Sequence, residues 1–121
     1  MSDILRQGRI VWAELLDPQG RNPKVRPAVV LTSTSEIHPD GEIVIAAVTS
    51  QTDTVPSELA VELPWPWNGH PRTKLNRRNV VVCSWLVTIP VAEIRSLGGH
   101  VPLPELARIL SIVMRPPDPS S

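Results

Sequence analysis

One short segment of this chain, Arg26-Pro27 followed by an apolar run, strongly limits how the chain can fold. Ala28 to Leu31 is apolar and rich in β-branched residues, which is typical of a buried strand. Pro27 disfavours a helical backbone at the residue before it, so Arg26 is expected to be extended. The sequence therefore predicts a permanently charged guanidinium with five N–H donors at the point where the core begins.

Similar short runs recur along the chain and are separated by turn-forming residues. The expected strands are 8–15, 26–32, 42–49, 58–63, 78–84 and a short sixth at 85–89. Asp40-Gly41 favours a hairpin between the second and third strands. The third strand is apolar without interruption from Ile43 to Val48, which indicates that both of its faces are covered.

A helical pattern is clear only near the end of the chain. Pro104 to Met114 is expected to be a helix, because apolar residues recur there at helical spacing and Pro104 suits the first helical position. Val91 to Leu97 is expected to form one or two helical turns, which Gly98-Gly99 would end. Short strands in hairpins plus a terminal helix predict a mainly β fold, namely a small, strongly bent antiparallel barrel.

The length and composition narrow the class of protein. The 121 residues fit a single domain, 1–121, with an ordered core at about 8–114 and a disordered tail at 115–121. No apolar run is long enough for a membrane helix, the start lacks the pattern of a signal peptide, and Cys83 is the single cysteine. We therefore expect a cytoplasmic protein, and the scattered histidines predict no metal site.

Charge is unevenly distributed although the formal net charge is zero. The segment 28–63 holds six acidic residues and no Lys or Arg, whereas 64–92 holds four basic residues and no acid. Folding can gather these basic residues on one face, but ordinary solvated surfaces fit the same pattern.

Two residues can form a phosphate site if the second and third strands are neighbours. Arg26 begins one strand and Thr49 ends the other, so both are expected at one end of one sheet. A guanidinium and a hydroxyl there suit a phosphate. Trp65 and Trp67 lie in a proline-rich loop, where they either stack on unpaired bases or cover a core edge or a dimer interface.

Three segments in order resemble the MazF/PemK (Kid) toxins of bacterial toxin–antitoxin systems. They are Gly8-Arg9-Ile10-Val11-Trp12, Arg26-Pro27-Ala28-Val29-Val30-Leu31 and Ile45-Ala46-Ala47-Val48-Thr49-Ser50-Gln51. The resemblance spans about residues 8–113 and implies an SH3-like barrel of the MazF/PemK/CcdB type, a homodimer, and sequence-selective cleavage of single-stranded RNA without metal or cofactor. In this family the 2′-hydroxyl attacks the adjacent phosphate, and an antitoxin with an acidic disordered segment blocks the RNA groove.

Carried over by position, the resemblance assigns catalysis to Arg26 and Thr49. Arg26 would neutralise the phosphate and act as a proton donor, and Thr49 would orient the phosphate by a hydrogen bond. The loop 16–25 would border the RNA channel, and His70 is a candidate substitute for the general base. The expected substrate-binding residues are Arg21, Lys24, Ser50, Gln51, Trp67, His70, Arg72, Lys74 and Arg77.

The chain departs from some family members in the fifth strand. Ser84 stands where they carry an aspartate, Val82 stands where they carry an arginine, and a histidine of their first loop is absent. An alternative hypothesis is therefore a binding module with a degenerate site, which acts only through contacts with an antitoxin, a gyrase-type target, or operator DNA together with the antitoxin.

Overall fold

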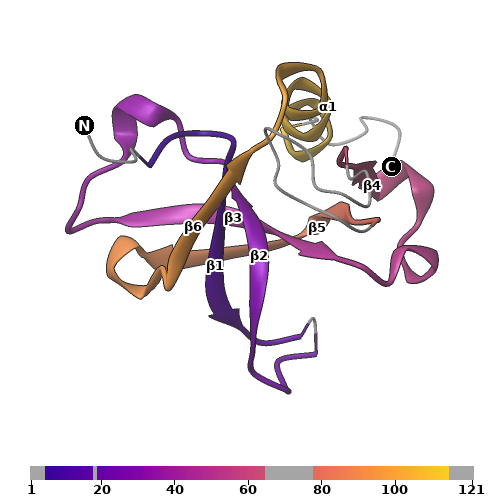
Figure 1. Ribbon diagram of the computed structural model, residues 1–121, viewed down its shortest axis with the longest axis horizontal. Helices are drawn as coiled ribbons and strands as arrows, with labels where there is room; N and C mark the ends of the chain where they lie inside the picture. Colours follow the sequence, from indigo (N-terminus) through magenta and orange to yellow (C-terminus); the bar gives the residue numbers. More distant parts are fainter. Residues whose placement is uncertain (1–4, 18, 65–77, 115–121) are drawn as a thin grey trace, which may run out of the picture.

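The described part of the chain, residues 5–17, 19–64 and 78–114 of a computed structural model, folds as one curved sheet with one α-helix (Figure 1). Its six strands are all antiparallel and follow the order β4-β5-β3-β2-β1-β6. The elements are β1 (Arg9–Leu15), β2 (Lys24–Val30), β3 (Glu42–Thr49), β4 (Ala60–Glu62), β5 (Val80–Pro90), β6 (Ser96–His100) and α1 (Leu103–Val113), with 3₁₀ turns at 34–36, 52–54, 57–59 and 91–93. The predicted mainly β fold with a terminal helix and a strongly bent antiparallel barrel is confirmed, as a half-barrel.

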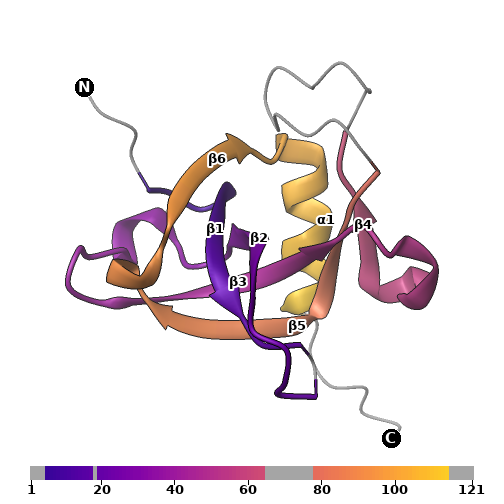
Figure 2. The ribbon, with the colours of Figure 1, turned by 60° about the horizontal axis from the view of Figure 1, so that its bottom comes forward.

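Helix α1 lies within the curve of the sheet and covers one of its faces (Figure 2). The helix starts within one residue of its predicted beginning and has a proline in its first turn, where an N–H is not needed. Leu106 and Ile109 point into what we call the helix-side core. Its buried members are Ile10, Val29, Leu31, Ala46, Val48, Val61, Leu63, Val81, Cys83, Val101, Leu106 and Ile109.

The other face of the sheet carries a second layer of apolar side chains, which we call the opposite core. Its buried members are Val11, Ala13, Leu15, Ala28, Val30, Ile43, Ile45, Ala47 and Ile89. The two cores alternate along β2 and β3, because successive side chains of a strand point to opposite faces. Along β3, Ile45 and Ala47 enter one core and Ala46 and Val48 enter the other, so the expected burial of both faces is confirmed.

Strand β5 corrects the prediction of two separate strands at 78–84 and 85–89. It is continuous from Val80 to Pro90, because no glycine or proline interrupts it. Its register against β3 shifts between the pairs Ala46↔Leu86 and Val48↔Val81, so the strand bends there without ending.

The expected helical turns at 91–97 are wrong. Only residues 91–93 form a 3₁₀ turn, and the glycines that were expected to end a helix lie inside strand β6. A Cβ at Gly98 would lie 3.2 Å from the carbonyl oxygen of Ile10, so glycine allows β6 to approach β1 closely. The glycine pair at 98–99 therefore belongs to a strand that lies close to β1, and it does not end a helix.

Smaller boundaries also differ from prediction. Strand β2 is Lys24–Val30 and not 26–32, and β1 begins at Arg9, one residue after its predicted start. The predicted strand 58–63 is shortened to β4 by the 3₁₀ turn at 57–59. The tryptophan loop with the basic residues to 77, and the tail 115–121, lie outside the described residues. Within the described residues, the helix is too short to span a bilayer.

Candidate active site

The pairing of β2 with β3 brings the two predicted phosphate-binding residues to the same end of the sheet. The antiparallel register runs through Val29↔Ala46 and Ala28↔Ala47, and two further steps along each strand lead to Arg26 and Thr49. Since side chains alternate, Arg26 lies on the face of Ala28 and Thr49 on the face of Ala47, both members of the opposite core. The site therefore continues the face of the sheet that α1 does not cover.

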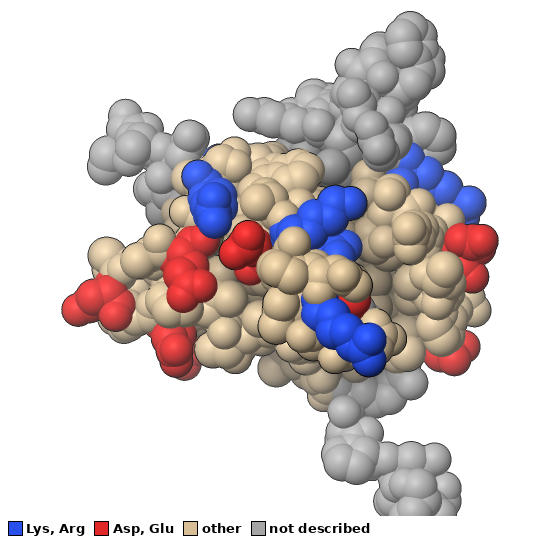
Figure 3. Space-filling model, turned by 90° about the horizontal axis from the view of Figure 1, so that it is seen from below, with Lys and Arg blue, Asp and Glu red and all other residues tan. Residues whose placement is uncertain are grey.

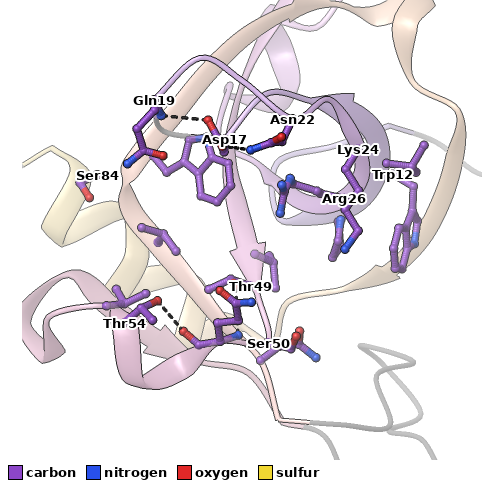
Figure 4. Close-up of a pocket in the computed structure, with 18 of the residues that line it drawn as sticks. Trp12, Asp17, Gln19, Asn22, Lys24, Arg26, Thr49, Ser50, Thr54 and Ser84 are labelled. Carbon is purple, nitrogen blue, oxygen red and sulfur yellow. Dashed lines mark hydrogen bonds between the residues drawn. The ribbon is translucent and has the colours of Figure 1, made fainter.

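A cleft of about 950 Å³ opens at this end of the sheet (Figure 4). In this view Arg26, Lys24 and Trp12 lie on one side, Gln19 and Ser84 lie on the other, and Thr49 lies between them. The β1–β2 loop, the segment 50–56 and strand β5 all contribute to the lining, which comprises Trp12, Asp17, Gln19, Asn22, Lys24, Val25, Arg26, Pro27, Val48, Thr49, Ser50, Gln51, Thr54, Val55, Pro56, Asn79, Val82, Ser84 and Trp85.

The cleft gathers five of the residues that the sequence analysis selected. They are Lys24, Arg26, Thr49, Ser50 and Gln51. Arg21 is exposed on the β1–β2 loop and does not line the cleft. The remaining predicted binding residues, Trp67, His70, Arg72, Lys74 and Arg77, lie outside the described residues, as does Trp65.

Arg26 is half-buried in the cleft with part of its hydrogen-bonding capacity unused. Its Nε is buried and has no hydrogen-bond partner among the described residues. The central carbon of its guanidinium lies 5.2 Å from the centroid of the Trp85 ring, a distance suited to a cation–π contact. Leaving a buried donor unpaired costs about 1–3 kcal/mol, so the side chain would be stabilised by a shift that brings this N–H to an oxygen atom in the cleft.

Thr49 ends β3 with its hydroxyl held by the following turn. Its Oγ1 accepts a hydrogen bond of 3.1 Å from the backbone N–H of Gln51, and the Oγ1 of Thr54 donates to the Gln51 carbonyl at 2.8 Å. A hydroxyl that accepts from the backbone still carries a hydrogen that it can donate. Thr49 can therefore donate to an anion beside Arg26.

The β1–β2 loop is built around the carboxylate of Asp17, which the sequence analysis did not select. Oδ1 accepts backbone N–H groups from Gln19 at 3.1 Å and Arg21 at 2.8 Å, and Oδ2 accepts the Asn22 side-chain amide at 2.8 Å. Asn22 has a φ of 55°, in the left-handed region that asparagine tolerates. The loop that forms one wall of the cleft is thus fixed by its own hydrogen bonds.

These hydrogen bonds lower the pKa of Asp17 below its ordinary value, the largest contribution coming from the backbone N–H of Arg21. A carboxylate with a depressed pKa contributes its full stabilisation above its unfolded pKa and loses it as pH falls through the folded pKa. We expect the stability advantage of the wild type over Asp17→Asn to be constant near neutral pH and to shrink below about pH 4. Urea unfolding from pH 3 to 7 measures this, and parallel losses for the two proteins would contradict it.

Other lining residues could not have been selected from local sequence signals. Trp12 and Trp85 come from β1 and β5, and Asn79 is buried just before β5. Ser84 lines the cleft, and Asp17 is the one acidic residue among the described lining residues. Cys83 is buried in the helix-side core, where desolvation raises the pKa of its thiol, so it behaves as a small apolar residue.

The surface around the site carries both basic and acidic side chains. Seen from the side of the β1–β2 loop, several basic side chains lie near the centre of the face and acidic ones lie toward both sides (Figure 3). Arg21 and Lys24, both exposed, belong to the loop and the strand that follows it. Among the described residues, no cluster of three or more His, Cys, Asp or Glu side chains is arranged to hold a metal ion.

The arrangement of strands and helix is the MazF-like fold. MazF from Deinococcus radiodurans superposes with a TM-score of 0.70 at 20% identity, covering 93% of this chain and 94% of that one. A MazE–MazF complex from the same organism gives 0.68 at 20% identity, covering 92% and 94%. An endoribonuclease from a mycobacterial species gives 0.68 at 13% identity, covering 98% and 99%.

The family is shown by the sequence itself. The family model for PemK-like, MazF-like toxins of type II toxin–antitoxin systems matches residues 6–115, so the chain belongs to this family. The resemblance seen in the three sequence segments is therefore confirmed. No individual curated protein matches the chain significantly.

Proposed function

We propose that this toxin-family protein is a sequence-selective endoribonuclease that cuts single-stranded RNA without a metal ion. The observation that carries the proposal is that Arg26, whose buried Nε has no hydrogen-bond partner among the described residues, and Thr49 line one cleft. A guanidinium and an O–H donor that line the same cleft suit the non-bridging oxygens of a phosphodiester.

In the proposed reaction the RNA supplies its own nucleophile. The 2′-oxygen forms a bond to the adjacent phosphorus and loses its proton, while the bond from phosphorus to the 5′-oxygen breaks and that oxygen gains a proton. The products are a 2′,3′-cyclic phosphate and a 5′-hydroxyl end. Negative charge grows on the phosphate oxygens in the transition state, and Arg26 and Thr49 stabilise it there.

The lining of the cleft favours catalysis by charge stabilisation over catalysis by a strong general base. Asp17 accepts three hydrogen bonds and its pKa is lowered, so its carboxylate is a weak proton acceptor at neutral pH. Ser84 carries no charge. We therefore assign to Arg26 the largest share of the rate enhancement that the described residues supply.

The same cleft has groups suited to a single strand. Lys24 is exposed beside Arg26 and can bind a neighbouring phosphate, while Ser50 and Gln51 can form hydrogen bonds to base edges. The indole of Trp12 supplies aromatic surface in the lining. Readout of bases by Ser50 and Gln51 is the proposed source of sequence selectivity.

We further propose a cytoplasmic homodimer that is inhibited by an antitoxin with an acidic segment. A relative of the same fold is described as crystallised as a MazE–MazF complex, which supports the antitoxin. Carboxylates of such a segment suit the guanidinium of Arg26 and the ammonium of Lys24, so the segment is expected to compete with RNA for the cleft.

The test is incubation of the purified protein with a long RNA in excess EDTA. We expect discrete fragments with 5′-hydroxyl ends, and no cleavage of an oligonucleotide that carries a 2′-deoxy sugar at the cleaved position. Loss of cutting in EDTA, cutting of the deoxy substrate, or 5′-phosphate ends would refute the mechanism.

The alternative of a binding module is favoured by one observation, the serine at position 84 in the cleft wall. It predicts that the protein binds the RNA or a protein partner and leaves the RNA intact in both the presence and the absence of divalent metal. Bound but uncut RNA in the same experiment supports this reading.

A further inference from the structure

We propose that Trp85 is a positioning residue that sets the orientation of the Arg26 guanidinium by stacking on it. This inference rests on the proposed function and assigns to a residue of β5 a role in the same site. The contact that carries it is the 5.2 Å separation between the Arg26 guanidinium carbon and the Trp85 ring centroid.

Stacking restrains a guanidinium without using its hydrogen-bond donors. The five N–H groups of arginine lie in the plane of the group, and the guanidinium carbon of Arg26 lies over the Trp85 ring. The buried Nε of Arg26 is accordingly left without a partner among the described residues. A phosphate that enters the cleft would therefore meet a cation that the ring restrains without occupying its N–H groups.

The position of Trp85 follows from the register shift in β5. In a regular strand Ser84 and Trp85 would point to opposite faces, yet both line the cleft. The ladder with β3 shifts between Ala46↔Leu86 and Val48↔Val81, and this irregularity allows the two successive side chains to reach the same space.

Trp85 is itself held in place by the opposite core. Its indole is partly buried and packs against that cluster of buried residues. An anchored aromatic ring has few alternative rotamers, so it can restrain the flexible side chain that it contacts. The charge of Arg26 attracts RNA from any orientation, but only an aligned guanidinium stabilises the transition state well.

The expected consequence is a loss in kcat larger than the change in KM. For Trp85→Leu we expect kcat to fall about tenfold and KM to change by less than about threefold, as loss of a partly buried cation–π contact implies. Trp85→Phe keeps a π face and is expected to stay within about threefold of wild type. Trp85→Met, which fills the space without a ring, should behave as Trp85→Leu and replaces it if that variant folds poorly.

Coupling to Arg26 separates positioning from direct contact with RNA. In an Arg26→Lys background the cation is a compact ammonium with no plane to orient, so Trp85→Leu should change kcat by less than about twofold. An equal loss in both backgrounds, or a loss confined to KM, overturns the proposal, because Trp85 would then act on the RNA itself.

An NMR measurement tests the contact between Trp85 and Arg26 independently of whether the protein cleaves RNA. The Arg26 Nε–H resonance, assigned by its absence in Arg26→Ala, should shift and broaden in Trp85→Leu. It should shift again when wild type binds a single-stranded 2′-deoxy oligonucleotide. If wild type cuts no RNA but these shifts occur, the enzymatic proposal fails and the stack stands. A resonance unaffected by Trp85→Leu overturns the stack even if RNA is cut.

Discussion

Arg26→Ala is expected to lower the rate of RNA cleavage by about a thousandfold while the protein stays folded. The substitution removes the positive charge of a residue that lines the cleft, together with its buried Nε–H. Arg26 lies at the start of β2 and is half-buried, so its loss removes no large part of either core. Single-turnover cleavage of a defined oligonucleotide measures the effect, which we expect mainly in kcat.

The matched control is Arg108→Ala. Arg108 is exposed on α1, which covers the face of the sheet away from the cleft, and it does not line the cleft. Cleavage within about twofold of wild type is expected, since an exposed arginine outside the site changes little. If Arg26→Ala loses activity only in proportion to its loss of folded protein, the proposed role of Arg26 in the reaction is wrong.

Ile109→Ala is expected to have the largest effect on stability and a small effect on the cleft. Ile109 is 0% exposed and packs in the helix-side core. Truncation of a fully buried isoleucine removes about 2–5 kcal/mol from the free energy of unfolding, through lost burial and the cavity left behind. Urea unfolding at neutral pH measures the loss.

The same helix offers an exposed control. Leu103 is 75% exposed at the start of α1, so Leu103→Ala should change the free energy of unfolding by less than about 0.5 kcal/mol. Activity per folded Ile109→Ala molecule should stay near that of wild type, because Arg26 and Thr49 lie on the other face. A loss of stability in Leu103→Ala as large as that in Ile109→Ala would contradict the division into two cores.

The strands with clear apolar runs could be predicted from the sequence, because burial of both faces demands such runs. Ile43 to Val48 is the clearest case, with side chains entering both cores. Strand β6 could not be predicted in this way, since Gly98 and Gly99 carry no apolar side chain. The place of Gly98 in a strand follows from the close approach of β1, which only the folded chain shows.

The two central residues of the candidate site were predictable for a local reason. Arg26 precedes a proline and a buried apolar run, and Thr49 ends another such run. The assumption that these two strands are neighbours was enough to place both residues at one end of the sheet. Asp17 and Trp85 had no such signal. Asp17 matters through hydrogen bonds to residues two to five positions later, and Trp85 reaches the cleft through a register shift.

The turn centred on Asp17 has a consequence for how such a toxin can diversify. Its carboxylate accepts three hydrogen bonds from Gln19, Arg21 and Asn22, so these residues are held together without hydrogen bonds from the side chains of the strands. Ordering such a turn costs little entropy when a ligand arrives. Other sequences built around an aspartate at position 17 should therefore be able to replace this turn and change one wall of the cleft, while Arg26 and Thr49 keep their places on β2 and β3.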